Sequence, residues 1–134
     1  NHQHLKEIKQ TFHQINSSYD SEILFVPYRG NFSRGIWITA YFPFEGTQDE
    51  AVKAYQEFYQ DAAFTFVSEQ DIDLKQAVNT NKCILHVQKQ EGQLVIYSAI
   101  DNLLKGASGQ AVQNFNLAFG LDEKTGLNLK SIAF

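Results

Sequence analysis

The chain has 134 residues, 43% of them hydrophobic and 19% charged, with a formal net charge of −4 at pH 7. This length supports one domain with a single core, and the composition is ordinary for a globular protein. The negative balance, without a Lys/Arg cluster, argues against a nucleic-acid surface, and no apolar run reaches the roughly 20 residues of a membrane span. The single cysteine excludes an internal disulfide and makes the cytoplasm the expected compartment.

An amphipathic helix is predicted at the start of the chain. Apolar residues recur there at intervals of three and four, namely Leu5, Ile8, Phe12 and Ile15. The polar run at residues 16–18 ends this helix. Residues 23–27 then predict a short strand, followed by a turn in which Gly30 and Asn31 tolerate a positive φ.

The clearest predicted strand covers residues 35–44. Its side chains are apolar or aromatic on both faces. One face is predicted to carry Ile36, Ile38, Ala40, Phe42 and Phe44, and the other Trp37, Thr39 and Tyr41. We therefore expect helices to cover one face and a partner subunit to cover the other. Thr47 and Glu50 have the spacing of a capping box, which predicts a helix from there to about Tyr59.

Further strands are predicted at residues 64–67, 77–78, 83–87 and 94–99, with a polar connection at 68–73. Residues 89–92 join the last two strands as a hairpin loop. Strands outnumber helices and come in hairpins, so we predict an α+β fold with a mostly antiparallel or mixed sheet and helices on one face. Trp37, Tyr41, Ile84 and Tyr97 are expected to share one face of that sheet.

The stretch at residues 99–127 is predicted to hold the end of a buried strand, a polar pivot and a helix. Asp101 or Asn102 can cap that helix by accepting a hydrogen bond from its free N–H groups. Its expected core stripe consists of Leu104, Ala107, Ala111, Phe115 and Ala118. Gly106 and Gly109 each lower the stability of a helix by roughly 1 kcal/mol relative to Ala. Glycines tolerated inside a helix suggest that another backbone or a ligand approaches closely there. Gly120 suits a left-handed C-cap.

Two pieces of this stretch carry a family resemblance. Asp-Asn-Leu-Leu-Lys-Gly-Ala at residues 101–107 and Gly-Gln-Ala-Val-Gln-Asn-Phe-Asn at residues 109–116 resemble the C-terminal signature of the N-acetyl-gamma-glutamyl-phosphate reductases, NADP-dependent enzymes of arginine biosynthesis. The first piece is also similar to aspartate-semialdehyde dehydrogenases, but the second piece favours the reductases. A non-catalytic dimerisation or binding module of the same fold is a further alternative.

The resemblance implies a fold similar to the C-terminal domain of glyceraldehyde-phosphate dehydrogenase-like enzymes. Residues 1–100 would form a substrate-binding and dimerisation domain, and residues 101–134 a helix and tail that pack back towards an NADP-binding domain. The chain has no methionine and no Gly-x-Gly-x-x-Gly, so we expect a piece of a longer enzyme that is inactive alone, with NADP bound mainly outside it. A small acyl-phosphate substrate and a homodimer or homotetramer are implied.

Two histidines stand near the start, in His2-Gln3-His4-Leu5-Lys6-Glu7-Ile8. These residues suit metal ligands, a base with its orienting acid, or plain surface positions. A His-x-His pair alone supplies too few ligands for zinc, which needs three or four, so we expect no metal site. The segment resembles the reductases' His-x-His-x-Pro-Glu-Ile motif, with Lys6 in place of the proline. By this resemblance His4, His2 and Glu7 are candidate catalytic residues, and a helix N-terminus favours the neutral imidazole that a general base needs.

Arg34-Gly35-Ile36 precedes the long strand. A solvated arginine is the plain interpretation, although a guanidinium can hold a carboxylate or an acyl phosphate through two parallel hydrogen bonds. The reductases resemble this chain in carrying Arg-Gly-Ile here, and their substrates carry both groups, so Arg34 is the substrate-binding candidate. Tyr28 replaces a histidine of the family pattern, which weakens any role for that position.

Cys83 alternates with apolar neighbours in a predicted strand, which indicates a buried, inert thiol. The family's nucleophilic cysteine lies in a Gly-Cys-Tyr context upstream of the His-x-His motif, and no such tripeptide occurs here. In related enzymes an asparagine at the strand-to-helix junction approaches the nicotinamide. By resemblance Asn102, with Lys105 and Gly106, is the candidate NADP-contacting group.

Overall fold

The structure is a computed structural model that describes residues 3–131. The chain forms two compact units, Asn1–Asn31 and Phe32–Phe134. The predicted division at residues 100 and 101 falls inside the second unit, at the end of its last strand, and stays a prediction about a longer protein. Within the described residues no helix is long and apolar enough to cross a membrane.

The first unit consists of helix α1 (Gln3–Ile15) and the segment that follows it. The predicted end of this helix is confirmed, because Asn16 Oδ1 accepts hydrogen bonds from Ser18 N at 3.1 Å and Ser18 Oγ at 2.7 Å. The apolar stripe of α1 is only partly covered. Leu5 and Ile8 are half-buried, whereas Ile15 is exposed.

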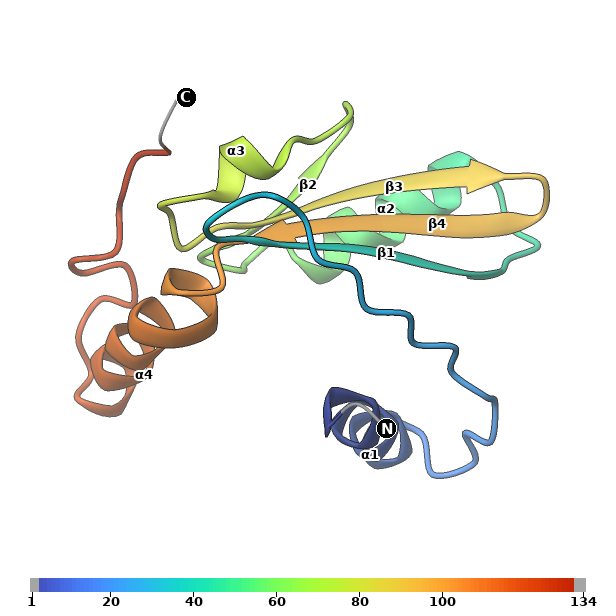
Figure 1. Ribbon diagram of the computed structural model, residues 1–134, viewed down its shortest axis with the longest axis horizontal. Coiled ribbons are helices and arrows are strands. Elements are labelled where there is room, and N and C mark those ends of the chain that lie inside the picture. Colours follow the sequence, from blue (N-terminus) through green and yellow to red (C-terminus); the bar gives the residue numbers. More distant parts are fainter. Residues whose placement is uncertain (1–2, 132–134) are drawn as a thin grey trace. The chain divides into compact units, whose positions relative to one another are not determined.

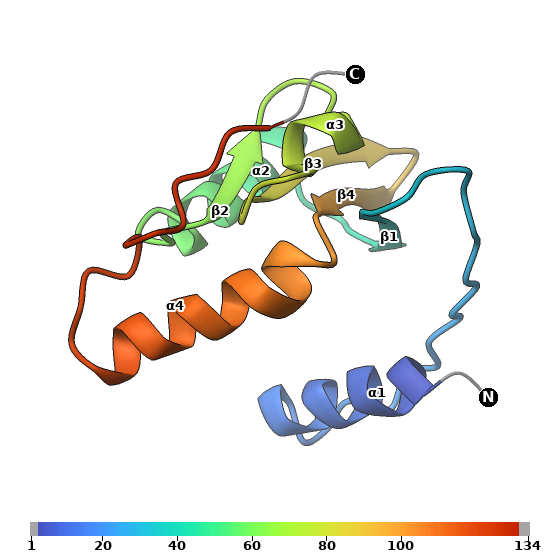
Figure 2. The same cartoon turned by 60° about the vertical axis from the view of Figure 1, so that its left-hand side comes forward.

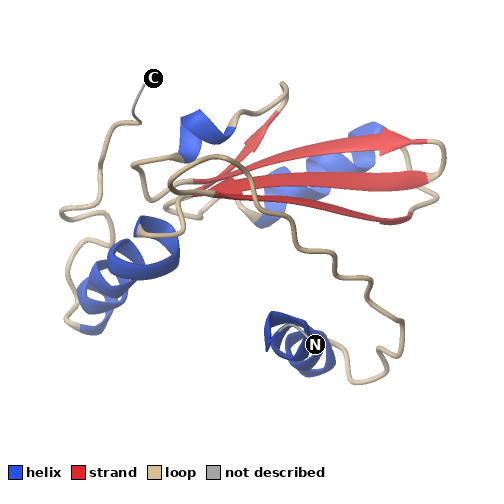
Figure 3. Cartoon of the chain, viewed as in Figure 1, coloured by secondary structure: helices blue, strands red, loops and turns tan. Residues whose placement is uncertain are grey.

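Residues 23–27 form a loop and not the predicted strand (Figure 3). Half-buried Ile23 and Phe25 still alternate with exposed Leu24 and Val26, as in a strand. A strand also needs a neighbour for its backbone hydrogen bonds, and no strand of the described chain pairs with this segment. The prediction was wrong because side-chain alternation does not reveal whether a partner strand exists.

The second unit is built on a four-stranded mixed sheet with the order β1-β4-β3-β2 (Figure 1). The strands are β1 (Ile36–Pro43), β2 (Thr65–Ser68), β3 (Cys83–Gln90) and β4 (Gln93–Ile100). β4 is antiparallel to both β1 and β3, whereas β2 runs parallel to β3. The predicted α+β class with a mostly antiparallel, mixed sheet is confirmed.

The β3–β4 hairpin closes with a two-residue turn. Gln90 pairs with Gln93, and the residues between them, Glu91 and Gly92, have φ values of 43° and 81°. Two positive φ values are what a type I′ turn requires, and the twist of that turn matches the twist of the strands. The hairpin is therefore as predicted, with strands that run further into the loop.

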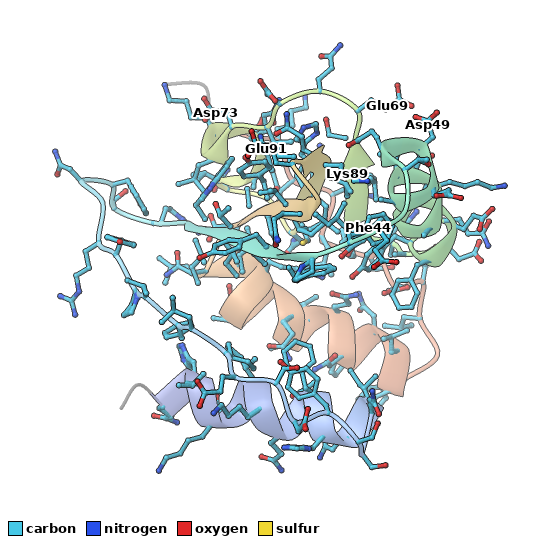
Figure 4. The ribbon with its side chains drawn as sticks, turned by 90° about the vertical axis from the view of Figure 1, so that its right-hand side faces the viewer. Phe44, Asp49, Glu69, Asp73, Lys89 and Glu91 are labelled. Carbon is cyan, nitrogen blue, oxygen red and sulfur yellow. The ribbon has the colours of Figure 1, made fainter. Side chains whose placement is uncertain are left out.

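Helix α2 (Gln48–Phe58) packs on one face of the sheet, mainly against β3 and β2, and lies behind it in Figure 1. On the same face Ile36, Ile38 and Phe42 of β1 are exposed, so the predicted helical cover does not extend over β1. It begins with the predicted capping box, in which Glu50 N donates to Thr47 Oγ1 at 3.2 Å and Thr47 N donates to Glu50 Oε2 at 2.7 Å. The core beneath it consists of Ala51, Val87, Leu94 and Ile96. Figure 4 looks onto the hairpin end of the sheet, where Glu91 is labelled, and shows α2 with its Asp49 to one side.

The first residue of α2 is tied to β3. Gln48 Nε2 donates to Val87 O at 2.8 Å, and Lys89 N donates to Gln48 Oε1 at 2.5 Å. Both backbone groups lie beyond the point where β2 stops pairing with β3. The glutamine amide therefore satisfies the strand edge that β2 leaves open.

A short helix, α3 (Leu74–Ala77), ends where a strand is predicted at residues 77–78. Lys75 N donates to Asp73 Oδ1 at 2.8 Å and Asp73 N donates to Gln76 Oε1 at 3.0 Å, so a second capping box starts this helix. The strand prediction was wrong because two adjacent apolar residues carry no period, whereas an Asp followed three residues later by Gln favours a helix start.

Beyond β4 the chain passes through a π-helix, η1 (Leu104–Ser108), into helix α4 (Gly109–Ala118), which leads away from the end of the sheet (Figure 2). The helix ends at Gly120, whose φ is 67°. Leu121 N donates to Asn116 O at 2.8 Å and Gly120 N to Leu117 O at 3.3 Å. These are the two bonds of a Schellman motif, so the predicted C-cap at Gly120 is confirmed.

The apolar stripe predicted as the core face of this helix is largely exposed. Ala107, Ala111, Phe115 and Ala118 lie on the surface, and Leu104 is half-buried. The buried positions of α4 are Gly109 and Asn116 instead. The prediction was wrong for the described chain because α4 packs mainly on η1 and not on the sheet. Packing of this stripe against an NADP-binding domain stays a prediction.

The face of the sheet opposite α2 carries a group of ring-bearing and apolar side chains, which we call the aromatic face. It consists of Trp37, Tyr41, Phe66, Ile84, His86 and Tyr97. The Tyr97 ring lies 6.0 Å from Trp37 and 6.0 Å from His86, measured between ring centroids. Tyr41 is 65% exposed and Trp37 is 40% exposed. The prediction that Trp37, Tyr41, Ile84 and Tyr97 share one face is confirmed.

Candidate functional site

The candidate site lies at one end of the sheet, where β1 starts, β4 ends and α3 is followed by a turn (Figure 1). At its centre is Asp101, the residue that follows β4, and its side chain is fully buried. Three backbone groups donate to its carboxylate: Asn79 N to Oδ2 at 2.7 Å, and Leu103 N and Leu104 N to Oδ1 at 2.8 and 3.0 Å. The predicted capping role of Asp101 is confirmed.

Arg34 completes the shell of donors around Asp101. Its Nη2 donates to Oδ1 at 2.9 Å, and its Nε lies 2.7 Å from Oδ2. The Nε–H is not well directed at that oxygen, so this second contact is an ion pair and not a full hydrogen bond. Arg34, proposed from sequence as a ligand for substrate anions, therefore already faces an anion of its own chain.

Asn102, the predicted cofactor contact, holds the start of β1. Its Oδ1 accepts a hydrogen bond from Gly35 N at 2.6 Å. Asp101 and Asn102 thus bind two consecutive residues, Arg34 and Gly35, so the start of β1 is fastened to the end of β4.

Burial is the largest single influence on the pKa of Asp101 and raises it, because a buried carboxylate loses its hydration. The hydrogen bond from Arg34 lowers the pKa, as do those from the backbone of Asn79, Leu104 and Leu103. Together these bonds outweigh burial, and the pKa of Asp101 lies below its ordinary value of 3.8. The carboxylate is therefore charged at neutral pH.

A consequence of the lowered pKa of Asp101 is a loss of stability in acid. A carboxyl whose pKa is lower in the folded than in the unfolded chain adds stability above its ordinary pKa of 3.8, and this stability is lost as the pH falls through the lowered value. Urea unfolding of the chain should show the free energy of unfolding falling below about pH 4. In the Asp101→Asn variant the free energy of unfolding should fall less steeply below about pH 4. The same fall in the variant as in the wild-type chain would contradict a lowered pKa of Asp101.

The other predicted cofactor residues lie on η1. Lys105 Nζ donates to Gln113 Oε1 at 3.4 Å and lies 5.6 Å from the centroid of the Phe64 ring. Gln113 Nε2 in turn donates to Glu123 Oε1 at 2.6 Å. Gly106 is different, because a Cβ built on it would meet no atom within 4 Å. The lysine is therefore held by its own chain, and the backbone at Gly106 lies open.

The junction of η1 and α4 is tightly packed against Asn81. Gly109 N donates to Leu104 O, five residues back, as a π-helix requires. A Cβ on Gly109 would lie 1.6 Å from Asn81 Oδ1 and 2.9 Å from Leu104 O. Asn81 is buried, and its Nδ2 donates to Leu127 O at 3.1 Å. The close approach predicted at the helical glycines is therefore found at Gly109, within the chain itself.

The candidate catalytic residues His4 and Glu7 lie in the first unit. Both are exposed on α1, one helical turn apart, and His4 is in the first turn of this helix. Glu7 Oε1 accepts a hydrogen bond from Gln3 Nε2 at 3.2 Å. His2 lies outside the described residues. Among the described residues, no group of three or more His, Cys, Asp or Glu could hold a metal ion.

Three polar residues at the site and sheet were not identified from sequence. Asn79 donates its backbone N–H to Asp101 and has a φ of 64°, and Asn81 supports Gly109. For Asn79 the available signal was an Asn after an apolar pair, because Asn tolerates a positive φ. No such signal marks Asn81. His86 lies buried on the aromatic face, with its Nδ1 3.0 Å from Ser68 O, and no local pattern marks it out.

Cys83 is in a strand, as predicted. Its side chain is half-buried and not fully buried, and its Sγ lies 3.6 Å from Ser98 Oγ.

Comparison with known proteins decides the family. The sequence model described as semialdehyde dehydrogenase, dimerisation domain, matches residues 1–102. The chain belongs to this family. The matched range contains Arg34, Asp101 and Asn102, so the fastening of β1 to β4 lies within the semialdehyde dehydrogenase dimerisation domain.

Curated relatives extend the similarity over nearly the whole chain. It is 63% identical over 130 residues to the N-acetyl-gamma-glutamyl-phosphate reductase of Christiangramia forsetii, covering 97% of this chain and 40% of that protein. It is 56% and 53% identical over 133 residues to those of Parabacteroides distasonis and Bacteroides thetaiotaomicron, covering 99% of this chain and 41% of each. The resemblance predicted from sequence is confirmed, and the chain spans about 40% of the length of these relatives.

Proposed function

We propose that this chain is the dimerisation and substrate-binding part of an NADP-dependent N-acetyl-gamma-glutamyl-phosphate reductase. The observation that carries the proposal is the identity of 53–63% over 97–99% of the chain to proteins of that name. The reaction reduces an acyl phosphate to a semialdehyde and releases phosphate. Such an enzyme of amino-acid synthesis, with a single cysteine in this part, fits the cytoplasm.

The family resemblance suggests a role for residues of each unit, taken by itself. In this proposal His4 acts as the general acid or base of the reaction. Glu7, one turn later on α1, orients the His4 imidazole. Arg34 binds an oxyanion of the substrate, which carries both a carboxylate and a phosphoryl group. In this proposal the nucleophilic cysteine lies outside this chain, and the position of Cys83 in β3, 3.6 Å from Ser98 Oγ, supports a structural role for that thiol.

The residues of η1 fit a cofactor at one point. A Cβ on Gly106 would meet no atom within 4 Å, which leaves room for a ligand there. Asn102, just before η1, lies at the junction that the resemblance assigns to the nicotinamide. NADPH, when bound, supplies the hydride. This chain would contribute the Gly106 backbone and the side chains of Asn102 and Lys105. The remaining contacts to the cofactor would come from residues outside this chain.

A second candidate is an aspartate-semialdehyde dehydrogenase. The family description covers semialdehyde dehydrogenases generally, and residues 101–107 are similar to both enzymes. The substrates differ in chain length and in the acetylated amine, so a comparison of the two semialdehydes as substrates separates the candidates.

We further propose that the aromatic face pairs with a second copy of this chain, in a dimer or in a tetramer of dimers. A two-fold axis places the same surface patch of two chains in contact, so each patch is buried against its copy. Exposed apolar patches of this kind usually mark interfaces. Light scattering at micromolar concentration should give at least twice the chain mass of 15.3 kDa.

Two variants locate the interface. Tyr41→Glu places a charge on the aromatic face, where Tyr41 is 65% exposed, and should shift the mass towards one chain. Phe58→Glu changes a side chain of α2 that is 77% exposed and should leave the mass unchanged. A wild-type chain that stays monomeric, or a Tyr41→Glu variant that stays dimeric, would contradict this interface.

A further inference from the structure

The Arg34 guanidinium has two edges that can each hold a planar oxyanion. One edge combines Nε–H with one N–H of Nη2, and the other combines the remaining N–H of Nη2 with Nη1. The first edge faces Asp101, since Nε lies 2.7 Å from Oδ2 and Nη2 lies 2.9 Å from Oδ1. The arginine is therefore bound along one side by its own chain.

Asp101 is itself held rigidly. Its side chain is fully buried, and the backbone N–H groups of Asn79, Leu103 and Leu104 all donate to it. These donors come from two separate segments, the turn after α3 and the start of η1. A carboxylate fixed from two sides gives the guanidinium one preferred orientation.

The second edge of the guanidinium remains available. The Arg34 side chain is 27% exposed, and among the described residues its polar side-chain contacts are with Asp101 alone. The Nη1–Nη2 edge presents two parallel N–H donors, which match the two oxygens of a carboxylate or a phosphoryl group. A lysine could satisfy Asp101 but would offer no such second edge.

We propose that Asp101 is a positioning residue that occupies the Nε–Nη2 edge of Arg34 and thereby directs the Nη1–Nη2 edge at an oxyanion of the substrate. This inference rests on the proposed function, in which Arg34 binds substrate. It assigns the buried ion pair a purpose besides stability. Asp101 touches no substrate, and its effect on the reaction passes through Arg34.

A double-mutant cycle in a full-length protein that carries this chain tests the proposal. The variants are Arg34→Ala, Asp101→Asn and both together, with KM and kcat measured for N-acetylglutamyl phosphate. Arg34→Ala should raise KM about tenfold to a hundredfold, the range expected for lost hydrogen bonds to a charged group. Asp101→Asn should raise KM about tenfold with kcat nearly unchanged. In the Arg34→Ala background it should add less than about twofold, because residues that act as one unit are not additive.

Three further variants separate positioning from stability. Arg34→Lys keeps a cation beside Asp101, so the thermal midpoint should stay near wild type while KM rises as in Arg34→Ala. Asp73→Asn alters an N-cap aspartate that binds Lys75 N on α3, and Arg29→Lys alters an exposed arginine of the first unit. Both should leave KM unchanged.

The outcomes distinguish this inference from the proposed function. Additive effects of Arg34→Ala and Asp101→Asn on KM, or a normal KM in Arg34→Lys, would overturn the positioning role while leaving the enzyme assignment intact. A normal KM in Arg34→Ala would remove Arg34 from the substrate site. Absence of any reduction of the acyl phosphate by the wild-type protein would overturn the proposed function itself.

Discussion

In a full-length protein that carries this chain, and if the proposed reductase activity holds, His4→Ala is expected to lower kcat by roughly 10²–10⁴, the usual contribution of a general acid or base. The motivation is the position of His4 in the first turn of α1, with Glu7 one helical turn away on the same helix. Steady-state kinetics with saturating NADPH and acyl phosphate measures the change. Because proton transfer acts in the transition state, KM should change much less than kcat.

His13→Ala is the matched control for that experiment. His13 lies in the last turn of the same helix, edge-on to Tyr19 at 6.1 Å between ring centroids, and has no assigned part in the chemistry. The kcat of the His13→Ala variant should equal the wild-type value. Full activity in His4→Ala would move the proton transfer to His2 or exclude both histidines.

Gly109→Ala is expected to destabilise the chain by about 1–3 kcal/mol, the range for an overpacked interior position. The added methyl would lie 1.6 Å from Asn81 Oδ1 and 2.9 Å from Leu104 O. Asn81 is buried, and its Nδ2 holds it in place by donating to Leu127 O. Either the asparagine or the π-turn must move. Thermal unfolding followed by circular dichroism measures the loss.

Gly106→Ala provides the matched control, three residues earlier on η1. No atom lies within 4 Å of its added methyl, so the better helix propensity of Ala should raise stability by up to about 1 kcal/mol. Asn81→Ala removes the atom that the Gly109 methyl would strike, so Asn81→Ala with Gly109→Ala should cost less than the sum of the two single changes. Equal destabilisation by Gly106→Ala and Gly109→Ala would contradict this packing.

Local signals were sufficient for much of the second unit. The alternation of apolar residues predicted β1 and the β3–β4 hairpin, and the Thr47–Glu50 spacing predicted the start of α2. Both signals act between residues close in sequence, so the sequence contains all that is needed. Gly120 belongs to the same class, because its positive φ serves a turn completed within five residues.

The errors arose where structure depends on distant partners. The alternation at residues 23–27 is that of a strand, but no strand of the described chain pairs with it. The apolar stripe of α4 is regular, yet α4 has little of its own chain to pack against. Amphipathic pattern shows that a face needs cover and does not show what covers it.

The candidate site followed the same rule. Arg34 and Asp101 were each identified from sequence, one as an anion ligand and the other as a cap, but their pairing across 67 residues was not. Local spacing carries no information about such a contact, because it depends on the antiparallel pairing that sets Ile36 opposite Ile100. The structure thus turns two separate predictions into one connected pair.

The central claim is tested most directly by the reverse reaction of a full-length protein that carries this chain. N-acetylglutamate semialdehyde, NADP and inorganic phosphate are supplied together, and formation of NADPH is followed by absorbance. We expect NADPH to form only when all three are present, with aspartate semialdehyde a far poorer substrate at equal concentration. Faster turnover of aspartate semialdehyde, or no phosphate-dependent formation of NADPH from either semialdehyde, would contradict the assignment.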